Sequence, residues 1–229
     1  MFEQILPPFV AVSATREDVA VEDLFPEEEE QVAGAVPKRR REFATARTCA
    51  RTALAQLGIA PAAILNGSKG EPRWPAEVVG SITHCRGCRA CAVARRADLV
   101  TVGIDAEPNE SLPDGLLPDI ALPQERDAIR QLTASEPEVS WDRLLFCIKE
   151  SVYKAWFPLT GRWLGFEDAQ VSIDRSDASF LARLLVPGPT VEGRAIGAFA
   201  GRWLQRDGLL LAAIAMPVPD RRGRVANLT

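Results

Sequence analysis

The sequence predicts a mixed α+β (α/β) protein with helices and antiparallel strands in both halves of the chain. Apolar residues recur with helical spacing over residues 37–57 and again over residues 141–157. Each segment is followed by short apolar runs bounded by glycine, proline, asparagine or aspartate, which is typical of strands joined by turns. Because this order occurs in both halves, it permits two similar subdomains.

Length and composition indicate a globular protein. The chain has 229 residues, of which 47% are hydrophobic, enough for one sizeable core or two small fused cores. The first ten residues lack the basic start of a signal peptide, and no apolar run approaches the ~20 residues that a membrane-spanning helix needs. Five cysteines, an odd number, do not suggest the disulfide framework of a secreted domain. We therefore expect a cytoplasmic protein that does not insert into membranes.

Charge is distributed unevenly along the chain. The net charge of −4 argues against a dedicated nucleic-acid binder. Residues 17–30 hold eight acids and no base, whereas residues 38–51 hold six bases and one acid. The basic run is either a solvated helix face or a local site for an anion.

The first helix is expected from about Pro37 to Leu57, because proline suits a first helical position and Gly58 suits the end. Its expected buried stripe comprises Phe43, Ala46, Ala50, Leu54 and Leu57. The arginines that flank this stripe on one side are Arg40, Arg47 and Arg51. Arg39 lies in the first turn.

The middle of the chain is expected to form a loop and three strands. Residues 64–75 are dense in turn formers, and residues 80–85 and 88–96 have the composition of short strands. Residues 99–108 form an apolar strand that runs into two acids. Residues 108–140 are rich in proline and acids, so we expect an irregular connection with one short helix there.

The second half is expected to contain a helix over residues 141–157 and two hairpins. The hairpins span residues 169–186 and 197–216, and the second turns at Asp207-Gly208. The polar tail after Pro217 is expected to be frayed.

Two acids mark the end of the strand over residues 99–108. Asp105 and Glu107 are two residues apart, so in an extended chain their side chains point the same way and could share a hard divalent cation. The alternative is that both acids merely face water or cap the next turn.

The second helix carries an acid and a lysine on its polar side. Glu150 and Lys154 fall opposite the expected buried face, so one interpretation is an exposed ion pair one turn apart. Against it stands the scarcity of lysine, since the chain has 27 lysines and arginines and only four are lysines. All four, Lys38, Lys69, Lys149 and Lys154, lie in segments that hold other candidate groups. Codon usage that favours arginine is a competing explanation.

The one histidine, His84, follows Ser81 and Thr83 at the end of an expected strand. It has either a structural role or, after Gly80, a place among backbone amides and hydroxyls that receive phosphate oxygens. The chain has neither a Walker-type phosphate loop nor a G-x-G-x-x-G fingerprint, so standard ATP and dinucleotide sites lose their main support.

Three cysteines, Cys85, Cys88 and Cys91, match part of an iron–sulfur cluster motif. In a strand the first and third would share one face and the second would point the other way. The remaining cysteines, Cys49 and Cys147, are remote in sequence. We therefore expect small core residues and no cluster.

Four of these segments, taken in order, resemble one enzyme family. "RRREFATARTCAR", "SITHC", "VGIDAEP" and "FCIKESVYKAW" lie within residues 37–175. Together they resemble a 4′-phosphopantetheinyl transferase of the longer, pseudo-dimeric, surfactin-synthetase-activating type, nearest to the enterobactin-associated and actinobacterial branch.

The resemblance implies a reaction and a fold. Such enzymes use Mg²⁺, with Mn²⁺ as an alternative, to transfer the phosphopantetheine arm of coenzyme A to a serine of an acyl or peptidyl carrier protein, and they release adenosine 3′,5′-bisphosphate. The implied fold has two subdomains, residues 1–108 and 109–229, each a long helix on an antiparallel sheet, with coenzyme A between them. The implied partner is a transient, acidic carrier protein, and the enzyme itself is expected to be a monomer.

The resemblance also assigns roles to individual residues. The implied metal ligands are Asp105, Glu107 and Glu150, and Ala106 supplies no side-chain ligand between the first two. Glu150, Asp105 and Lys154 are the implied catalytic residues, with Glu150 as base for the carrier serine, as metal ligand, or as both. Arg39 and Arg47 match contacts to the 3′-phosphate, with Arg40 as an alternative to Arg39. The other implied phosphate contacts are Lys69, Thr83, His84, Lys149 and Lys154.

The same groups could also form a non-catalytic module that binds coenzyme A or a nucleotide. Catalysis would require a metal and cationic donors that stabilise charge on the phosphoryl oxygens, which Lys149 and Lys154 are expected to supply. Binding of coenzyme A does not distinguish the two hypotheses, whereas transfer to a carrier protein does.

Overall fold

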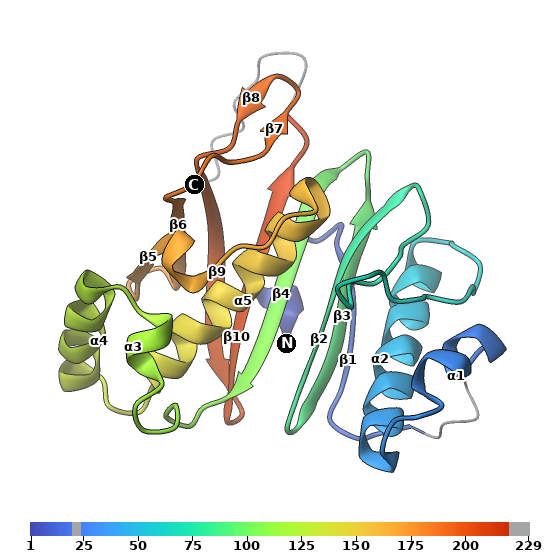
Figure 1. The fold of residues 1–229 in the computed structure, drawn as a ribbon, viewed down its shortest axis with the longest axis horizontal. Coiled ribbons are helices and arrows are strands. Elements are labelled where there is room, and N and C mark those ends of the chain that lie inside the picture. Colours follow the sequence, from blue (N-terminus) through green and yellow to red (C-terminus); the bar gives the residue numbers. More distant parts are fainter. Residues whose placement is uncertain (20–23, 220–229) are drawn as a thin grey trace.

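The structure is a computed structural model that describes residues 1–19 and 24–219. In these residues the strands form a three-stranded sheet in the order β1-β3-β2, a five-stranded sheet in the order β4-β10-β9-β6-β5, and a small two-stranded sheet (Figure 1). Every pairing is antiparallel. The predicted α+β class is confirmed.

The elements fall into two groups along the chain. The first group is the short 3₁₀ helix η1 (Phe2–Gln4), β1 (Ala11–Thr15), α1 (Pro26–Val32), α2 (Pro37–Gln56), β2 (Val78–Cys85) and β3 (Cys88–Arg95). The second group begins with β4 (Leu99–Pro108), α3 (Leu117–Ile120), α4 (Pro123–Ser135), α5 (Trp141–Thr160) and the 3₁₀ helix η3 (Phe166–Asp168). It ends with β5 (Ala169–Asp174), β6 (Ser179–Leu184), β7 (Thr190–Val191), β8 (Arg194–Ala195), β9 (Ala198–Arg206) and β10 (Leu209–Pro217).

Helix α2 covers one face of the three-stranded sheet. Of its predicted stripe, Phe43, Ala46, Ala50 and Leu54 are buried, and Leu57 is half-buried. Ala50 and Leu54 pack with Cys91 and Val93 of β3 in one cluster. The helix begins at Pro37 and is followed by Gly58 at φ +71°, a backbone conformation that glycine adopts without steric cost.

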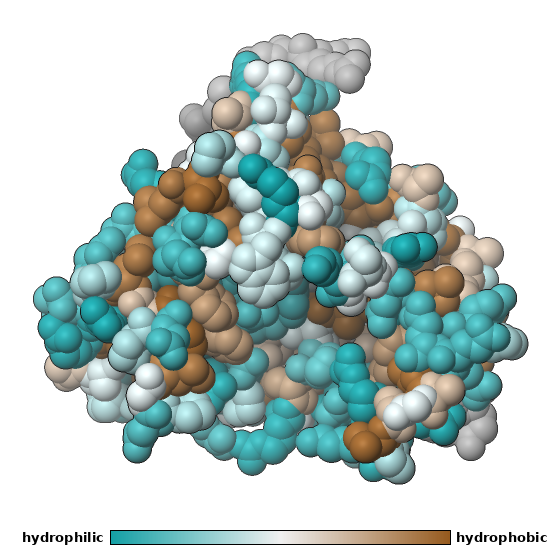
Figure 2. Space-filling model, in the orientation of Figure 1, coloured by the Kyte–Doolittle hydropathy of each residue, from teal (hydrophilic) through white to brown (hydrophobic). Residues whose placement is uncertain are grey.

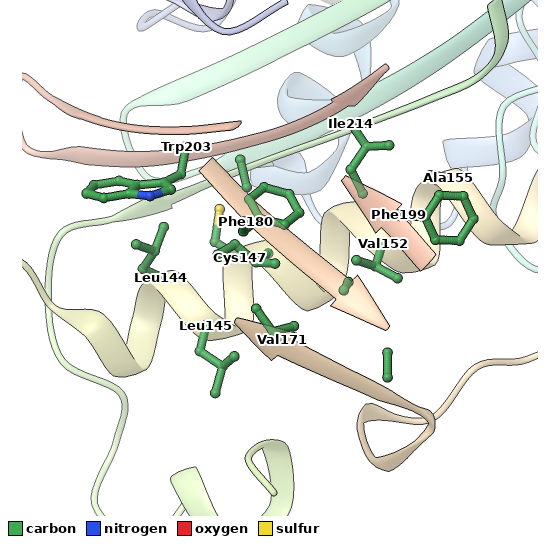
Figure 3. Close-up of a cluster of buried hydrophobic side chains, with 14 of the residues drawn as sticks. Leu144, Leu145, Cys147, Val152, Ala155, Val171, Phe180, Phe199, Trp203 and Ile214 are labelled. Atoms are coloured by element: carbon green, nitrogen blue, oxygen red, sulfur yellow. The ribbon is translucent and has the colours of Figure 1, made fainter. Parts of the chain in front are cut away.

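Helix α5 covers one face of the five-stranded sheet. Figure 3 shows Leu144, Cys147 and Val152 beside Phe180 and Phe199 of the sheet. The helix continues to Thr160, past the predicted end at residue 157, and stops at Gly161 with φ +62°.

A glycine brings α5 close to β4. A Cβ built on Gly103 would lie 2.2 Å from the carbonyl oxygen of Ser151, so only glycine fits there. Two residues away, the Thr101 hydroxyl donates a hydrogen bond to the carbonyl of Ala155 at 2.9 Å. The strand that ends in Asp105 is thereby fixed against the helix that carries Glu150.

The opposite faces of both sheets share one core with the N-terminal segment. Alternate residues of β3 and β4, among them Ala92 and Ile104, pack with Phe2 and Leu211 in this cluster. Phe2 is fully buried, so the first residues of the chain are part of the fold.

Two hydroxyl side chains join the sheets where β2 lies beside β4 (Figure 1). The backbone N–H of Ile104 donates to the Ser81 hydroxyl at 3.0 Å, and that of Ala106 donates to the Thr83 hydroxyl at 3.2 Å. Strand β4 precedes the predicted subdomain boundary at residue 108, yet it pairs with β10 in the sheet of the second half.

Several sequence predictions differ from the structure. Residues 108–140 contain two helices, including α4 with 13 residues, where one short helix was expected. Strand β1 and helix α1 had no predicted counterpart. The two hairpins of the second half are confirmed, with Asp207 and Gly208 at φ +52° and +76°. The expected frayed tail falls mostly at residues 220–229, outside the described residues.

The predicted geometry of the cysteine motif is wrong. Arg86 and Gly87 form a turn between two strands, so Cys85 lies directly opposite Cys88. Cys85 and Cys88 both contact the shared core, whereas Cys91 faces α2. All five cysteines are free thiols in the described part of the chain.

No helix in residues 1–19 and 24–219 combines the length and apolar character needed to cross a membrane.

Candidate functional site

A cleft of about 840 Å³ is lined by residues of α2 and β2 on one side and by residues of β4 and α5 on the other. The front of the molecule is hollowed there, between its two halves (Figure 2). Predicted site residues from both sides line it: Arg39, Arg47, Lys69, Thr83, His84, Asp105, Glu107, Glu150 and Lys154. The fold thus brings together residues that are up to 115 positions apart in the numbering, from 39 to 154.

Arg47 provides a buried cation on the α2 side of the cleft. Its side chain is 4% exposed, and it donates to the carbonyl of Ile64 at 2.6 Å and to Oδ1 of Asn66 at 2.5 Å. Its guanidinium carbon also lies 4.0 Å from the centre of the Phe43 ring. Burial lowers the pKa of Arg47 to about 10, so the group remains charged at neutral pH.

Arg39 and His84 contact each other on the same side of the cleft as Arg47. Nη1 of Arg39 lies 2.8 Å from Nε2 of His84. Because a guanidinium only donates, Nε2 of His84 accepts and this imidazole is neutral. Desolvation, and then the charge of Arg39, lower the pKa of His84. Arg40 does not line the cleft, so of the two neighbours Arg39 has the position of a ligand contact.

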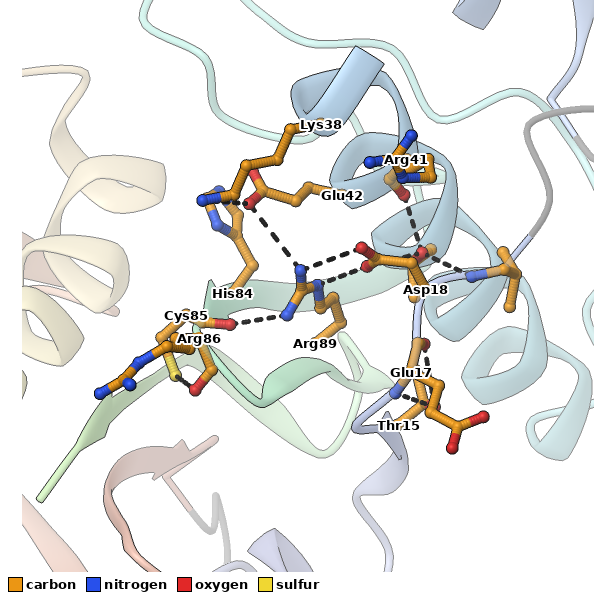
Figure 4. Close-up of polar contacts among 12 residues, drawn as sticks. Thr15, Glu17, Asp18, Lys38, Arg41, Glu42, His84, Cys85, Arg86 and Arg89 are labelled. Atoms are coloured by element: carbon orange, nitrogen blue, oxygen red, sulfur yellow. Dashed lines mark hydrogen bonds and ion pairs between the residues drawn. The ribbon is translucent and has the colours of Figure 1, made fainter. Parts of the chain in front are cut away.

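A buried arginine, Arg89, forms an ion-pair network next to Arg39 and His84. Figure 4 shows Arg89 of β3 between Asp18, Glu42 and the carbonyl of Cys85. Its Nε lies 2.8 Å from Asp18, and Glu42 lies 3.8 Å from both Arg89 and Arg39. No sequence motif pointed to Arg89. The acidic run over residues 17–30, which contains Asp18, was the available signal.

Asp105 stands at the centre of the opposite wall. Its Oδ1 accepts hydrogen bonds from the Thr83 hydroxyl at 2.9 Å and from Nζ of Lys154 at 2.6 Å. Its Oδ2 is buried and has no hydrogen-bond partner in the described structure. A buried carboxylate oxygen without a partner is a candidate ligand for a cation.

The other two acids of this wall repel Asp105. Desolvation, and then the charge of Asp105, raise the pKa of Glu107 to about 7 and raise that of Glu150. Arg143 offsets part of this repulsion, because its Nη1 lies 3.2 Å from Oε2 of Glu107. Three oxygen donors suit a hard cation. The three carboxylates stand apart in this structure, since no group of three possible ligands in the described ranges is close enough to hold a metal ion.

Lys154 does not form the exposed pair with Glu150 that helical spacing allowed. Its Nζ instead bonds Asp105 and the carbonyl of Ile104, which lies at 3.2 Å. The lysine therefore fixes one oxygen of Asp105 inside the cleft.

Lys149 does not line the cleft, and its expected contact with the phosphates of coenzyme A stays a prediction. Its Nζ bonds Glu125 at 2.9 Å and the carbonyls of Phe166 and Ala169 at 2.6 and 3.0 Å. These three acceptors use all three protons of the ammonium group. Residues 149 and 154 are five apart, which places them on different sides of one helix.

A smaller apolar pocket of about 130 Å³ adjoins the cleft. Its walls include Trp163, Leu164 and Phe166, and it shares Glu150 and Tyr153 with the cleft. The two cavities therefore meet at Glu150, to which the family resemblance assigns a catalytic role.

Comparison with known proteins identifies the family. The model of the 4′-phosphopantetheinyl transferase N-terminal domain matches residues 27–94, and that of the 4′-phosphopantetheinyl transferase superfamily matches residues 101–197. The chain is 55% identical to 4′-phosphopantetheinyl transferase Svp of Streptomyces mobaraensis, over 88% of this chain and 82% of Svp. It is 48% identical to PptT of Mycobacterium tuberculosis over 87% and 93% of the two chains, and 47% identical to Npt of Nocardia iowensis over 94% and 99%. The chain therefore belongs to the 4′-phosphopantetheinyl transferase family of enzymes.

Proposed function

We propose that this enzyme transfers the phosphopantetheine arm of coenzyme A to a serine of an acyl or peptidyl carrier protein, with Mg²⁺, and releases adenosine 3′,5′-bisphosphate. The observation that carries the proposal is that two charged walls meet in one cleft. The cationic wall comprises Arg39, Arg47 and Lys69 with His84, and the carboxylate wall comprises Asp105, Glu107 and Glu150. We also propose the longer, pseudo-dimeric type with subdomains 1–108 and 109–229, supported by a long helix on an antiparallel sheet in each half. Action as a monomer in the cytoplasm remains a prediction.

We assign the two cavities to the two ends of coenzyme A. Arg39, Arg47, Lys69 and His84 would contact its phosphates, since cationic and imidazole donors suit phosphate oxygens. The phosphopantetheine arm is uncharged apart from its phosphate, which suits the apolar pocket beyond Glu150. The bond to be broken would then lie next to Glu150, where the cavities meet.

Asp105, Glu107 and Glu150 would hold the metal. The unpartnered Oδ2 of Asp105 and the raised pKa values of both glutamates support this assignment, because a cation would relieve the desolvation and repulsion that raise them. Mg²⁺, or Mn²⁺ in its place, would supply positive charge beside the phosphate oxygens. Lys154 would hold Asp105 in place for this site.

Glu150 would accept the proton of the carrier serine. Its position where the cleft and the smaller pocket meet supports this role. The serine oxygen would form a bond to the phosphorus that carries the arm. The bond from that phosphorus to the bridging oxygen would break, and the electron pair would leave with adenosine 3′,5′-bisphosphate.

Transfer is tested by incubating the protein with Mg²⁺, coenzyme A and an apo-carrier, and then weighing the intact carrier by mass spectrometry. We expect the carrier to gain one phosphopantetheine group. A Ser→Ala carrier is the matched control. Tight binding of coenzyme A without any gain in carrier mass would instead support the non-catalytic binding module.

A further inference from the structure

We propose that Lys149 and Arg51 are positioning residues that act through two buried glutamates. Lys149 acts with Glu125 to hold the wall of the apolar pocket, and Arg51 acts with Glu28 to hold the cationic wall of the cleft. The assignment rests on the proposed function, because it divides coenzyme A between the apolar pocket and the cationic wall. The family resemblance implied a different role for Lys149, and it implied none for the other three residues.

The Glu28–Arg51 pair joins α1 to α2 and to the loop behind the cationic wall. Glu28 is fully buried, and its Oε2 lies 2.9 Å from Nη1 of Arg51. Its Oε1 accepts the backbone N–H of Ile64 at 2.8 Å. The carbonyl of Ile64 in turn accepts Nε of Arg47, so one residue links Glu28 to the cation that lines the cleft.

The Glu125–Lys149 pair joins α4 to α5 and to the segment behind the apolar pocket. Both side chains are 2% exposed, and Oε2 of Glu125 lies 2.9 Å from Nζ of Lys149. Oε1 of Glu125 accepts the backbone N–H of Val171 at 2.6 Å. Lys149 also binds the carbonyls of Phe166 and Ala169, two residues that line the pocket beside Glu150.

The two pairs are built in the same way. Each glutamate is the third residue of a short helix that begins with proline, and its Oε2 accepts the N–H of the residue before that proline, Phe25 or Leu122. In both pairs, Oε2 of the glutamate contacts the base on the long helix, which is Arg51 or Lys149. Oε1 accepts a backbone N–H, from Ile64 in the first pair and from Val171 in the second. The short sequences "FPEE" and "LPQE" carry this arrangement in the two halves.

Buried ion pairs contribute little net stability, because the cost of desolvating both charges offsets their attraction. These pairs do fix geometry, since each charged group is surrounded by partners at hydrogen-bond distance. We therefore expect removal of one base to disturb one wall more than the other. The Glu125–Lys149 pair should control the fit of the arm, and the Glu28–Arg51 pair should control the fit of the phosphates.

The test compares three probes by calorimetry in the presence of Mg²⁺: coenzyme A, adenosine 3′,5′-bisphosphate, which lacks the arm, and 4′-phosphopantetheine, which lacks the nucleotide. For Lys149→Met we expect affinity for coenzyme A and 4′-phosphopantetheine to fall by about tenfold, as when a partner that orients a ligand-binding group is removed. Affinity for the bisphosphate should change by less than about twofold. For Arg51→Met we expect the reverse selectivity. Affinity for coenzyme A and the bisphosphate should fall by about tenfold, and affinity for 4′-phosphopantetheine should change by less than about twofold.

Arg130→Met is the matched control, because Arg130 lies on α4 but its ion pair with Asp127 is exposed, at 74% and 62%. It should leave all three affinities unchanged. Lys149→Arg and Arg51→Lys keep the charge and change the geometry. They should show the same selectivity with smaller losses, and they replace the methionine variants if those do not fold.

Equal losses for all three probes in both variants, or no loss, would overturn the assignment and leave the pairs as ordinary parts of the core. If the wild-type protein binds coenzyme A but transfers nothing, the proposed reaction is overturned. The assignment of the two ion pairs to the two parts of coenzyme A can still be tested with the same fragments. Failure of that protein to bind coenzyme A would overturn both.

Discussion

Arg47 on α2 and Asp105 on β4 face the same cleft, but their surroundings differ. Arg47 has two oxygen acceptors and an aromatic ring around its guanidinium, so its position is set before any ligand arrives. Asp105 has one oxygen bonded to Thr83 and Lys154 and the other buried without a partner. Desolvation, and then the charge of Asp105, raise the pKa values of the two neighbouring acids.

The difference indicates that the cationic wall is already organised for phosphate, whereas Lys154 and Arg143 offset only part of the negative charge on the carboxylate wall. A wall whose donors are fixed contributes binding without further reorganisation. A wall of crowded carboxylates gains most from a cation, because the cation offsets repulsion that is already present. Substitutions on the two walls should therefore differ in whether added metal restores function.

The largest expected effect is on the carboxylate wall, at Glu150. Glu150→Gln keeps the size and one oxygen ligand but removes the proton acceptor. We expect the transfer rate to fall by ~10²-fold or more with metal and coenzyme A saturating, which is the usual contribution of general-base catalysis. Single-turnover assays with an apo-carrier measure this rate.

Carrier binding by the same variant should survive, since Glu150 is proposed to act on one hydroxyl. Full recovery at high Mg²⁺ would reject the role as base and leave only a metal ligand. Near-normal activity without added metal would remove Glu150 from the catalytic site altogether.

Asp105→Ala should cause a loss that metal partly reverses. The substitution deletes the unpartnered oxygen and also removes the ion-pair partner of Lys154. We expect affinity for Mg²⁺ to fall by about tenfold or more, as for other losses around a metal site. Calorimetric titration with Mg²⁺ measures the affinity, and activity should rise again at high metal concentration. Unchanged Mg²⁺ affinity would exclude Asp105 as a ligand.

On the cationic wall, Arg47→Ala should weaken coenzyme A binding in a way that metal does not repair. Loss of a charged hydrogen-bond donor costs about 1.5 kcal/mol or more, which corresponds to about tenfold in Kd. Desphospho-coenzyme A, which lacks the 3′-phosphate, is the control ligand and should lose less. Equal losses for both ligands would show that Arg47 does not contact that phosphate.

The smallest expected effect is on stability, and it has opposite signs on the two walls. The pKa of His84 is below its ordinary value of 6.5 in the folded protein, so the unfolded chain binds more protons and stability is lost as pH falls through 6.5. The pKa of Glu107 is raised from 4.5 to about 7, so the folded protein binds more protons and stability is lost as pH rises between those values.

Thermal unfolding of the metal-free protein across pH 5–8 tests these signs. His84→Gln should flatten the loss on the acid side, and Glu107→Gln should flatten the loss toward neutral pH. Because His84 is the one histidine in the chain, its contribution can be assigned without a competing imidazole. Identical pH profiles in both variants would contradict the opposite signs.

The sequence by itself determined most of the elements and most of the candidate residues that line the cleft. Helical spacing located α2 and α5, turn formers located the hairpins, and alternation along β4 gave Asp105 and Glu107 a common side. These features depend on residues a few positions apart, so local backbone geometry is enough to predict them. Only one short helix was expected where α3 and α4 lie, because prolines and acids weaken the helical signal there.

Only the tertiary structure decided which face of each element meets which partner. Lys149 and Lys154 lie on one helix, yet one binds Glu125 from α4 and the other binds Asp105 from β4. Arg39 rather than Arg40 lines the cleft. Periodicity says which side chains share a face, but the packing of elements distant in sequence sets what that face contacts.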